Sequence, residues 1–519
     1  MQQTGGGHEN ILGALLNDSY KLVMTYSFFQ NKMENDQTAF ELIFRKCPFG
    51  GQYVIFAGLN EVVRYIKNFK FTEEEIEFVK KNILPSDANQ KFFDYLRNLD
   101  SSQIKIRAMP EGSICFPKEP LISIEGPQGI CQLIETAVIN LVSFPSLIAT
   151  NASRMRQLAG QAHLLEFGLR RAQGPDGGMS ATQYSYLGGF DGTSNMMAGL
   201  KLGIPVSGTI AHSFVTSFSE LNDVESAELN GVNIKLRAIE YHKKMGIKTN
   251  QGELASFIAY AQSCSNNFLC LVDTYHTLKS GIPNFLAVAF ALDDAGIKAK
   301  GIRLDSGDLA QLSIQAKELF KHYGDQFQKD ISHLKVAASN DINEEALKDF
   351  IKKGHKIDIF GIGTHLVTCQ KQPALGLVYK LVECKNQIVM KLSEEYDKTT
   401  FPGQKNVYRV YTKSDQCVDI ITSINYLPEN NEFKCIDHIS KQRYHIKPTF
   451  IENLLQPVDY DYVPDLQTAK KYCTKQMKDF NGKVTRLDNP QKHLVLMSTE
   501  YYQMFQSKYD EIAIEEVIE

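Results

Sequence analysis

The sequence has no apolar run that approaches the length of a membrane-spanning segment. Hydrophobic residues make up 43% and charged residues 22% of its 519 residues, as in an ordinary globular protein. A spanning helix needs about 20 consecutive apolar residues, and a secretory leader needs a basic start followed by an apolar stretch. Because neither pattern occurs, we expect no membrane partner and a cytoplasmic location.

An excess of charge of either sign is also lacking. The chain has 56 lysines and arginines against 60 aspartates and glutamates, a net charge of −4. A nucleic-acid-binding surface usually shows a basic excess. We therefore expect no nucleic-acid partner, and any site for an anion must be local.

The ten cysteines form no CxxC pair, and the closest two, Cys264 and Cys270, have no histidine beside them at metal-ligand spacing. This usage is typical of reduced thiols in the cytosol. Two nucleotide-binding motifs are missing as well. Without GxxxxGK[ST], ATP would not bind on a P-loop, and without GxGxxG opening a β-α-β unit, we do not expect a Rossmann dinucleotide site.

What the sequence does contain is a set of short apolar runs that end in polar or glycine residues and lead into helical stretches. Their bodies are apolar enough for strands buried on both faces. Between 151 and 378 they alternate with helical segments, which favours a β/α barrel over a sandwich. The seven runs are 163–171, 186–195, 206–214, 268–276, 299–308, 335–341 and 357–364.

The rest of the chain surrounds this barrel. We expect residues 11–30 to form a helix capped by Asn17 or Asp18. The β-like runs 376–383 and 407–413 are expected to add antiparallel strands to the sheet of the first domain. The predicted division is a loose tail (1–10), a sandwich domain with connecting helices (11–150 plus 379–445), the barrel (151–378) and a C-terminal extension (446–519).

The carboxyl ends of parallel strands form the active-site floor of such folds. After the third run, Thr209, His212 and Ser213 lie close together. A histidine among small polar residues suits a nucleophile, a base or a phosphate acceptor; the alternative is a structural histidine. Because sugar and phosphate ligands suit these polar strand ends, the pattern indicates handling of a phosphorylated sugar.

Arginines also stand at the ends of two other runs. Arg170 and Arg171 precede a turn rich in Gly, Pro and Asp. An arginine side chain binds carboxylate or phosphate through two parallel N–H donors. One of the pair is expected to face the site, although both could be surface charges. Arg303 and Asp305 are two residues apart on a strand and so point the same way. Together they would hold an anion and a sugar hydroxyl, unless they form only a structural ion pair.

The last two runs end in small polar residues. Ser339 and Asn340 are placed to orient hydroxyls or a metal-bound water. Gly361, Gly363 and Thr364 would offer backbone N–H groups to a phosphate at a helix start.

These segments together resemble the nicotinate phosphoribosyltransferase family, in family order from about residue 11 to 380. The segments are 15-LLNDSYKLVMTYSF-28, 45-RKCPFGGQYVIFAGL-59, 166-EFGLRRAQGPDGG-178, 186-YLGGFDGTSN-195, 207-SGTIAHSFV-215, 271-LVDTY-275, 283-PNFLAVAFAL-292, 301-GIRLDSGDLA-310 and 361-GIGT-364. The resemblance implies an α/β fold, an irregular TIM-like barrel with an open-faced sandwich domain and a C-terminal extension. It also implies a homodimer in which Tyr20 reaches into the partner's site.

The reaction implied by the resemblance joins nicotinate to phosphoribosyl pyrophosphate, giving nicotinate mononucleotide and pyrophosphate in NAD salvage. The family is ATP-coupled, as a ligase, through a phosphohistidine that falls on His212, with Mg²⁺ or Mn²⁺ as the metal. Nicotinate contacts fall on Tyr20, Thr209, Arg303 and Arg170, ribose binding on Asp305, and phosphate binding on Thr364. His276 and His365 depart from the family pattern, which puts fine tuning of phosphate binding in question.

Two related enzymes and one non-enzyme remain as alternatives. Nicotinamide-using relatives carry an aspartate in the segment matching 191–195, where this chain has Ser194, so we expect nicotinate to be preferred. Quinolinate phosphoribosyltransferase shares the barrel but needs a denser basic pocket. A non-catalytic ligand-binding barrel is the third.

Overall fold

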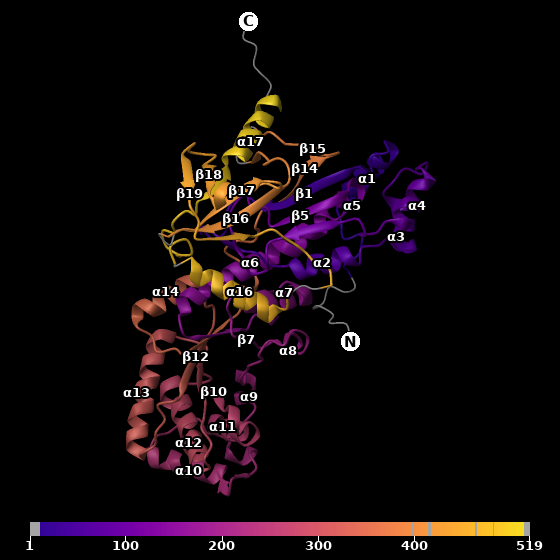
Figure 1. The fold of residues 1–519 in the computed structure, drawn as a ribbon. Coiled ribbons are helices and arrows are strands. Elements are labelled where there is room, and N and C mark those ends of the chain that lie inside the picture. Colours follow the sequence, from indigo (N-terminus) through magenta and orange to yellow (C-terminus); the bar gives the residue numbers. More distant parts are fainter. Residues whose placement is uncertain are drawn as a thin grey trace. The chain divides into compact units, whose positions relative to one another are not determined.

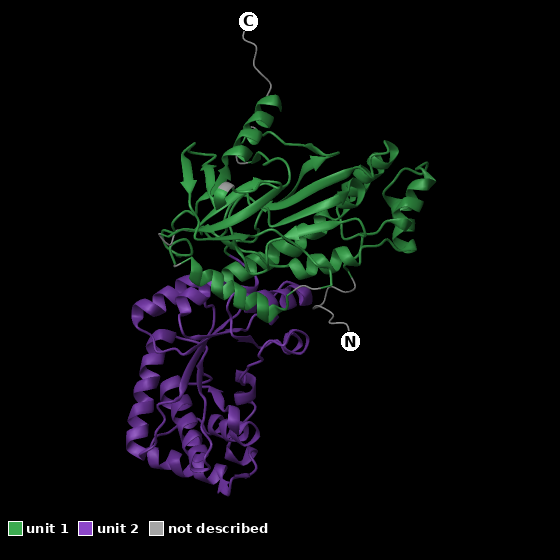
Figure 2. Ribbon diagram, viewed as in Figure 1, with its two compact units in different colours: residues 1–151, 371–519 green, residues 152–370 purple. Residues whose placement is uncertain are grey.

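The computed structural model describes residues 11–393, 395, 398–413, 417–461, 464–480 and 482–512. The tail predicted at 1–10 lies outside these residues. The chain divides into two compact units, residues 1–151 with 371–519 (unit 1) and residues 152–370 (unit 2) (Figure 2). Within the described ranges, no helix is long and apolar enough to cross a membrane.

Unit 2 contains a six-stranded sheet in which every neighbouring pair of strands is parallel, in the order β10-β11-β12-β13-β6-β7. This sheet confirms the predicted α/β class and forms part of a barrel. The strands are β6 (His163–Glu166), β7 (Gly192–Thr193), β10 (Leu269–Leu271), β11 (Gly301–Leu304), β12 (Lys335–Ser339) and β13 (Ile359–Ile362).

Helices connect these strands, as Figure 1 shows. Helix α12 (Ile282–Asp294) is buried from Ile282 to Leu292, and every residue of this stretch except Asn284 is apolar. Polar caps fix where others begin: the Asp308 carboxylate accepts from the Gln311 N–H at α13. The others are α7 (Gly174–Leu187), α8 (Met196–Leu202), α9 (His212–Thr216), α10 (Ile234–Met245), α11 (Gln251–Ser263), α13 (Leu309–Phe327), α14 (Glu344–Lys353) and α15 (Thr364–Val367).

Two of the seven predicted strands are wrong in extent. Helix α7 continues to Leu187, so the run 186–195 supplies only the two residues of β7. The run 206–214 supplies only Val206, which bridges Thr193, before α9 begins at His212. Both runs are interrupted by Gly and Ser, which favour turns, and glycine also weakens a strand.

Unit 1 contains an antiparallel sheet in the order β15-β14-β1-β5-β3-β21. Strand β14 (Leu377–Cys384) pairs with β1 (Gln37–Phe44), so the predicted strand at 376–383 does join this sheet. The remaining strands of this sheet are β3 (Lys105–Ala108), β5 (Ile122–Pro127), β15 (Gln387–Ile388) and β21 (Gln456–Pro457). A separate two-stranded sheet pairs β2 (Val54–Ile55) with β4 (Ile114–Cys115).

The strand predicted at 407–413 belongs to a different sheet. It is β16 (Lys405–Tyr411), in a second unit 1 sheet ordered β19-β18-β22-β17-β16-β20. Residues 446–519 contribute β20 (Phe450–Asn453) and β22 (Val495–Ser498) to it. The remaining elements here are β17 (Cys417–Ser423), β18 (Phe433–Ile436), β19 (Arg443–Ile446), α16 (Leu466–Asp479) and α17 (Thr499–Ile512).

The first helix is shorter than predicted. Helix α1 is Ser19–Gln30, with Asp18 as its N-cap residue, and the Asn17 side chain instead donates to the Leu133 carbonyl at 2.5 Å. The other unit 1 helices are α2 (Leu59–Lys67), α3 (Glu73–Asn82), α4 (Gln90–Asn98) and α5 (Gln128–Leu133), and α6 (Glu135–Ala159) runs on into unit 2.

A fully buried ion pair ties the second sheet together. The Arg409 and Asp419 side chains, both 0% exposed, sit opposite each other on β16 and β17. Arg409 donates from Nε and Nη2 to the two Asp419 oxygens at 2.9 and 2.6 Å, and from Nη1 to Gln476 on α16 at 2.6 Å. One guanidinium therefore links two strands and a helix.

Candidate active site

Three segments of unit 2 meet at the Arg303 guanidinium, which projects from the carboxyl end of β11. Its Nε donates to the Ser339 hydroxyl, at the end of β12, at 2.8 Å. Its Nη1 donates to the Thr209 hydroxyl at 3.2 Å. The structure thus brings together residues from three of the predicted polar strand ends.

Asp305 completes this group. Its Oδ1 accepts from Arg303 Nη2 at 3.0 Å and also from the Ser339 hydroxyl. The side chains of Arg303 and Asp305 remain 18% and 27% exposed. The pair is therefore not sealed in the core, and a ligand can reach both charges.

Arg303 and Ser339 line a narrow pocket beside the sheet, with a cavity volume of about 40 Å³. The Phe167 ring forms another wall, 5.6 Å from the guanidinium carbon of Arg303. A Cβ at Gly361 would lie 2.4 Å from that ring, so only glycine leaves Phe167 in place. The pocket joins a cation to an aromatic face, which suits a flat anion.

His212 lies at the start of α9 and contacts a buried carboxylate. Its Nε2 is 3.2 Å from Asp273 Oδ1; the histidine side chain is 46% exposed and that of Asp273 is 1% exposed. Since a carboxylate only accepts, Nε2 carries the proton in this contact, and in the neutral form of the ring Nδ1 then keeps its lone pair. Asp273 Oδ2 in turn accepts from the Asp305 N–H at 3.1 Å and from the Ser306 hydroxyl.

The backbone turns sharply where β12 and β13 end. Asn340 and Asp341, directly after Ser339, have φ of +101° and +43°, a left-handed geometry that residues other than glycine rarely adopt. Such outliers occur preferentially at binding sites. After β13, Gly363 is the N-cap residue of α15, and Thr364 is the first residue of that helix.

Comparison with known proteins identifies the family. Sequence models of the nicotinate phosphoribosyltransferase N-terminal domain, of the nicotinate phosphoribosyltransferase family and of its C-terminal domain match residues 15–143, 162–417 and 404–505. The chain belongs to the nicotinate phosphoribosyltransferase family.

Individual relatives extend over nearly the whole chain. The nicotinate phosphoribosyltransferase of Dictyostelium discoideum is 43% identical, covering 97% of this chain and 89% of the relative. Nicotinate phosphoribosyltransferase 2 of Arabidopsis thaliana is 44% identical, with 94% and 92% covered. The crystal structure of human nicotinic acid phosphoribosyltransferase superposes with a TM-score of 0.85 at 36% identity, covering 96% of this chain and 100% of that chain.

Four other residues predicted for the site are not among the residues that line this pocket. Arg170 and Arg171 are exposed in a short 3-10 turn, and neither lines the pocket described above. Ser194 is exposed and donates its backbone N–H to the Glu166 carbonyl at 3.0 Å. Tyr20 belongs to unit 1 and is 53% exposed.

Sequence reasoning missed two members of this candidate site, Asp273 and Phe167. Asp273 follows β10 in the segment 271-LVDTY-275, so its place at a strand end was a usable signal. Its importance depends on contact with His212, which is 61 residues earlier in the chain. Phe167 follows β6 in the same way, but an aromatic residue at a strand end carries no distinctive chemistry in sequence.

Proposed function

We propose that this chain joins nicotinate to phosphoribosyl pyrophosphate, forming nicotinate mononucleotide and pyrophosphate. The observation that carries the proposal is the Arg303 group, in which a guanidinium, two hydroxyls and a carboxylate converge beside a pocket. Family membership supplies the reaction. The geometry supports it because each partner of the reaction finds a matching group there.

Nicotinate would enter with its ring against Phe167 and its carboxylate toward Arg303 and Thr209. A guanidinium presents paired donors to a carboxylate, and the ring face would stack on the aromatic wall. The neutral amide of nicotinamide would leave part of this cation unpaired. Ser194 replaces the aspartate of nicotinamide-using relatives, which supports the same preference.

In the reaction, the nicotinate ring nitrogen forms a bond to ribose C1 while the bond from C1 to the pyrophosphate oxygen breaks. The electron pair of that breaking bond leaves with pyrophosphate, and C1 gains positive character in the transition state. Asp305 is placed to hold the ribose hydroxyls and to stabilise that charge. Ser339, Asn340, Gly361, Gly363 and Thr364 form the polar strand ends that would receive the phosphate groups.

A divalent cation, Mg²⁺ or Mn²⁺, fits this site as a complex with pyrophosphate rather than as an ion held by the chain alone. Asp305 and Asp273 are the carboxylates available, and Asp273 already accepts at both oxygens. The only group of three metal-ligating side chains among the described residues lies in unit 1. When bound, the cation neutralises charge on the leaving pyrophosphate.

His212 is the proposed phosphorylation site for ATP coupling. The Asp273 contact leaves the Nδ1 lone pair to attack the terminal phosphoryl group of ATP, with ADP as the leaving group. The phosphohistidine would add about two negative charges near the site. Asp273 acts as a positioning residue, since it holds the imidazole in this tautomer.

We expect His212→Ala to retain a basal rate of pyrophosphate release but to lose stimulation by ATP. Asp273→Asn should reduce that stimulation about tenfold, because the tautomer is no longer fixed. Initial rates with and without ATP measure both effects. His163→Ala is the matched control, since this histidine lies at the amino end of β6. Undiminished ATP stimulation in His212→Ala would remove the proposed role.

A homodimer is the proposed assembly, with Tyr20 contributing to the partner's site. Exposed apolar side chains on two helices support it: Met196 and Leu200 on α8 are 78% and 79% exposed, and Tyr20 and Val23 on α1 are 53% and 49% exposed. Grouped apolar exposure of this kind marks contact surfaces.

Sedimentation velocity of the wild-type chain should therefore show a dimer. Leu200→Glu should shift it toward monomer and lower activity together with dimer content, because a charge would be buried in the contact. Leu427→Glu is the control, as Leu427 is 82% exposed but belongs to neither helix. A monomeric wild type, or equal dissociation by both variants, would contradict the dimer.

The test of the function is an assay of pyrophosphate release from phosphoribosyl pyrophosphate, with nicotinate or nicotinamide as acceptor and with or without ATP. We expect nicotinate to be used at least about 100-fold better than nicotinamide, as for a buried charged contact. Release with nicotinamide alone would favour that enzyme class. A chain that binds nicotinate but releases no pyrophosphate would be a non-catalytic barrel.

A further inference from the structure

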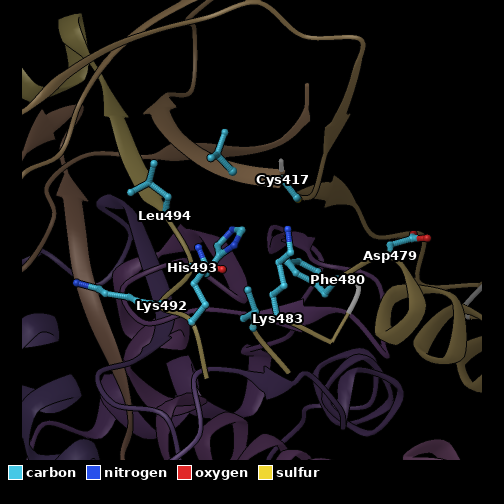
Figure 3. A pocket seen from close by; sticks show the side chains of 10 residues that line it. Cys417, Asp479, Phe480, Lys483, Lys492, His493 and Leu494 are labelled. Atoms are coloured by element: carbon cyan, nitrogen blue, oxygen red, sulfur yellow. The ribbon is translucent and has the colours of Figure 1, made fainter. Parts of the chain in front are cut away.

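Unit 1 contains a second pocket, of about 230 Å³, that the proposed reaction does not use. It lies where β17 begins, where α16 ends and where the following turn leads into β22 (Figure 3). Its apolar wall comes from Val418, Phe480, Val484 and Leu494, and its polar side from Lys483 and His493. The wall and the polar side lie within the region matched by the family's C-terminal domain.

The floor of this pocket is a buried imidazole. His493 is 6% exposed and stacks on the Phe116 ring, with 3.8 Å between ring centroids. Its Nε2 lies 3.4 Å from Asp419 Oδ2, so the ring faces the buried ion pair described above. Burial lowers the pKa of His493, so the ring is neutral near pH 7.

The ionisable groups next to His493 carry no net charge. Arg409 and Asp419 form the ion pair described above. The pKa of the buried Glu119 carboxyl is raised well above its usual range by burial and by Asp419, which keeps this group protonated. The net charge that a ligand meets is therefore set at the rim of the pocket.

That rim is positive. Figure 3 shows the Lys483 ammonium beside the His493 ring, whereas the Lys492 side chain runs along the rim with its ammonium directed away. No ion pair is formed by either lysine within the described part of the chain. The one rim carboxylate, Asp479, is already bound to the Lys475 ammonium at 2.8 Å.

We propose that this pocket binds a small organic anion, with its carboxylate or phosphate at Lys483 and a planar or apolar body against Phe480, Val484 and Leu494. The volume suits a body about the size of one aromatic ring rather than a dinucleotide. Because the pocket is in unit 1, the site is separate from the Arg303 group, and its test does not depend on the proposed function.

A metal ion is the competing occupant. Cys417, Asp419 and His493 place three potential ligand atoms within 4.8 Å of one another. However, both Asp419 oxygens already accept from Arg409. A cation bound there would sit beside a guanidinium and would have to displace it, so the electrostatics favour an anion.

Hydrogen exchange of the full chain, read by mass spectrometry, tests the proposal with four probes. Benzoate and phenyl phosphate carry the two anionic groups on a ring, benzamide is the neutral counterpart, and inorganic phosphate has no body. We expect at least one of the two ring anions to slow exchange in peptides covering 480–494, and the stronger one identifies the group. Equal protection by benzamide, or none by either anion, would overturn the proposal, and so would equal protection by inorganic phosphate.

Matched lysine variants locate the site. Lys483→Met should weaken the protecting anion's affinity at least tenfold, whereas Lys492→Met should change it less than threefold. Equal weakening by both would indicate diffuse charge and contradict a built site. Co²⁺ gives a thiolate charge-transfer band when bound to cysteine; such a band in wild type that is lost in Cys417→Ser would assign the pocket to a metal instead.

Discussion

Replacement of Arg303 by Gln should lower kcat/KM for nicotinate by about 10²- to 10³-fold, equivalent to about 3–4 kcal/mol of transition-state binding. The guanidinium holds Ser339, Thr209 and Asp305 at once. Its loss removes the cation that would pair with the nicotinate carboxylate and leaves Asp305 without its ionic partner. Steady-state kinetics of pyrophosphate release measure the effect.

Two further variants separate the causes. Arg303→Lys keeps the positive charge but not the paired N–H donors of the guanidinium, so kcat/KM for nicotinate should fall by less than in Arg303→Gln. Arg237→Gln removes a partly exposed arginine of α10 in the same unit, paired with Asp294, and should change kcat/KM less than threefold. The Arg303→Gln enzyme should also discriminate less between nicotinate and nicotinamide. If the preference for nicotinate over nicotinamide is unchanged, Arg303 does not bind the nicotinate carboxylate.

Replacement of Arg409 by Met should destabilise the second unit 1 sheet by about 3–5 kcal/mol, because it leaves the buried Asp419 carboxylate without its cation. Both side chains are fully buried, so water cannot take the place of the guanidinium. Since a chain with two units need not unfold in one step, the measurement is hydrogen exchange of the slowest amides in β16 and β17.

The double variant gives the sharper test of that pair. Arg409→Met with Asp419→Leu should recover much of the lost stability, since no charge then remains buried. Arg443→Met, on the exposed face of β19, is the control and should leave exchange nearly unchanged. If the double variant is as unstable as Arg409→Met alone, the contacts to Gln476 and the Ile114 carbonyl carry the stability instead.

Most of the barrel sheet could be predicted from sequence because strands buried on both faces are continuous apolar runs. Five runs yielded β6, β10, β11, β12 and β13, and the polar ends of β11 and β12 placed Arg303, Asp305 and Ser339 in one group. The strands predicted at 186–195 and 206–214 were wrong in extent because turn-forming residues interrupt the apolar residues of both runs.

Pairings between distant residues could not be predicted in the same way. Asp273 is an ordinary strand-end aspartate until His212 lies against it. Arg409 and Asp419 face each other only through the register of β16 and β17, which composition does not reveal. The strand at 407–413 was assigned to the wrong sheet for the same reason, because an antiparallel strand has no mark in sequence that names its neighbour.

The order of strands in unit 2 has a consequence for how the chain is made. His163, on the first strand of the sheet, pairs with Ile359, on the last, so β6 cannot be joined to β12 until β13 has been synthesised. During translation, the edge of β6 that pairs with β13 therefore stays unpaired until β13 is made. Pairing between strands that are far apart in sequence is slow. Productive biogenesis should thus depend on shielding that edge from other nascent chains until the final strand emerges.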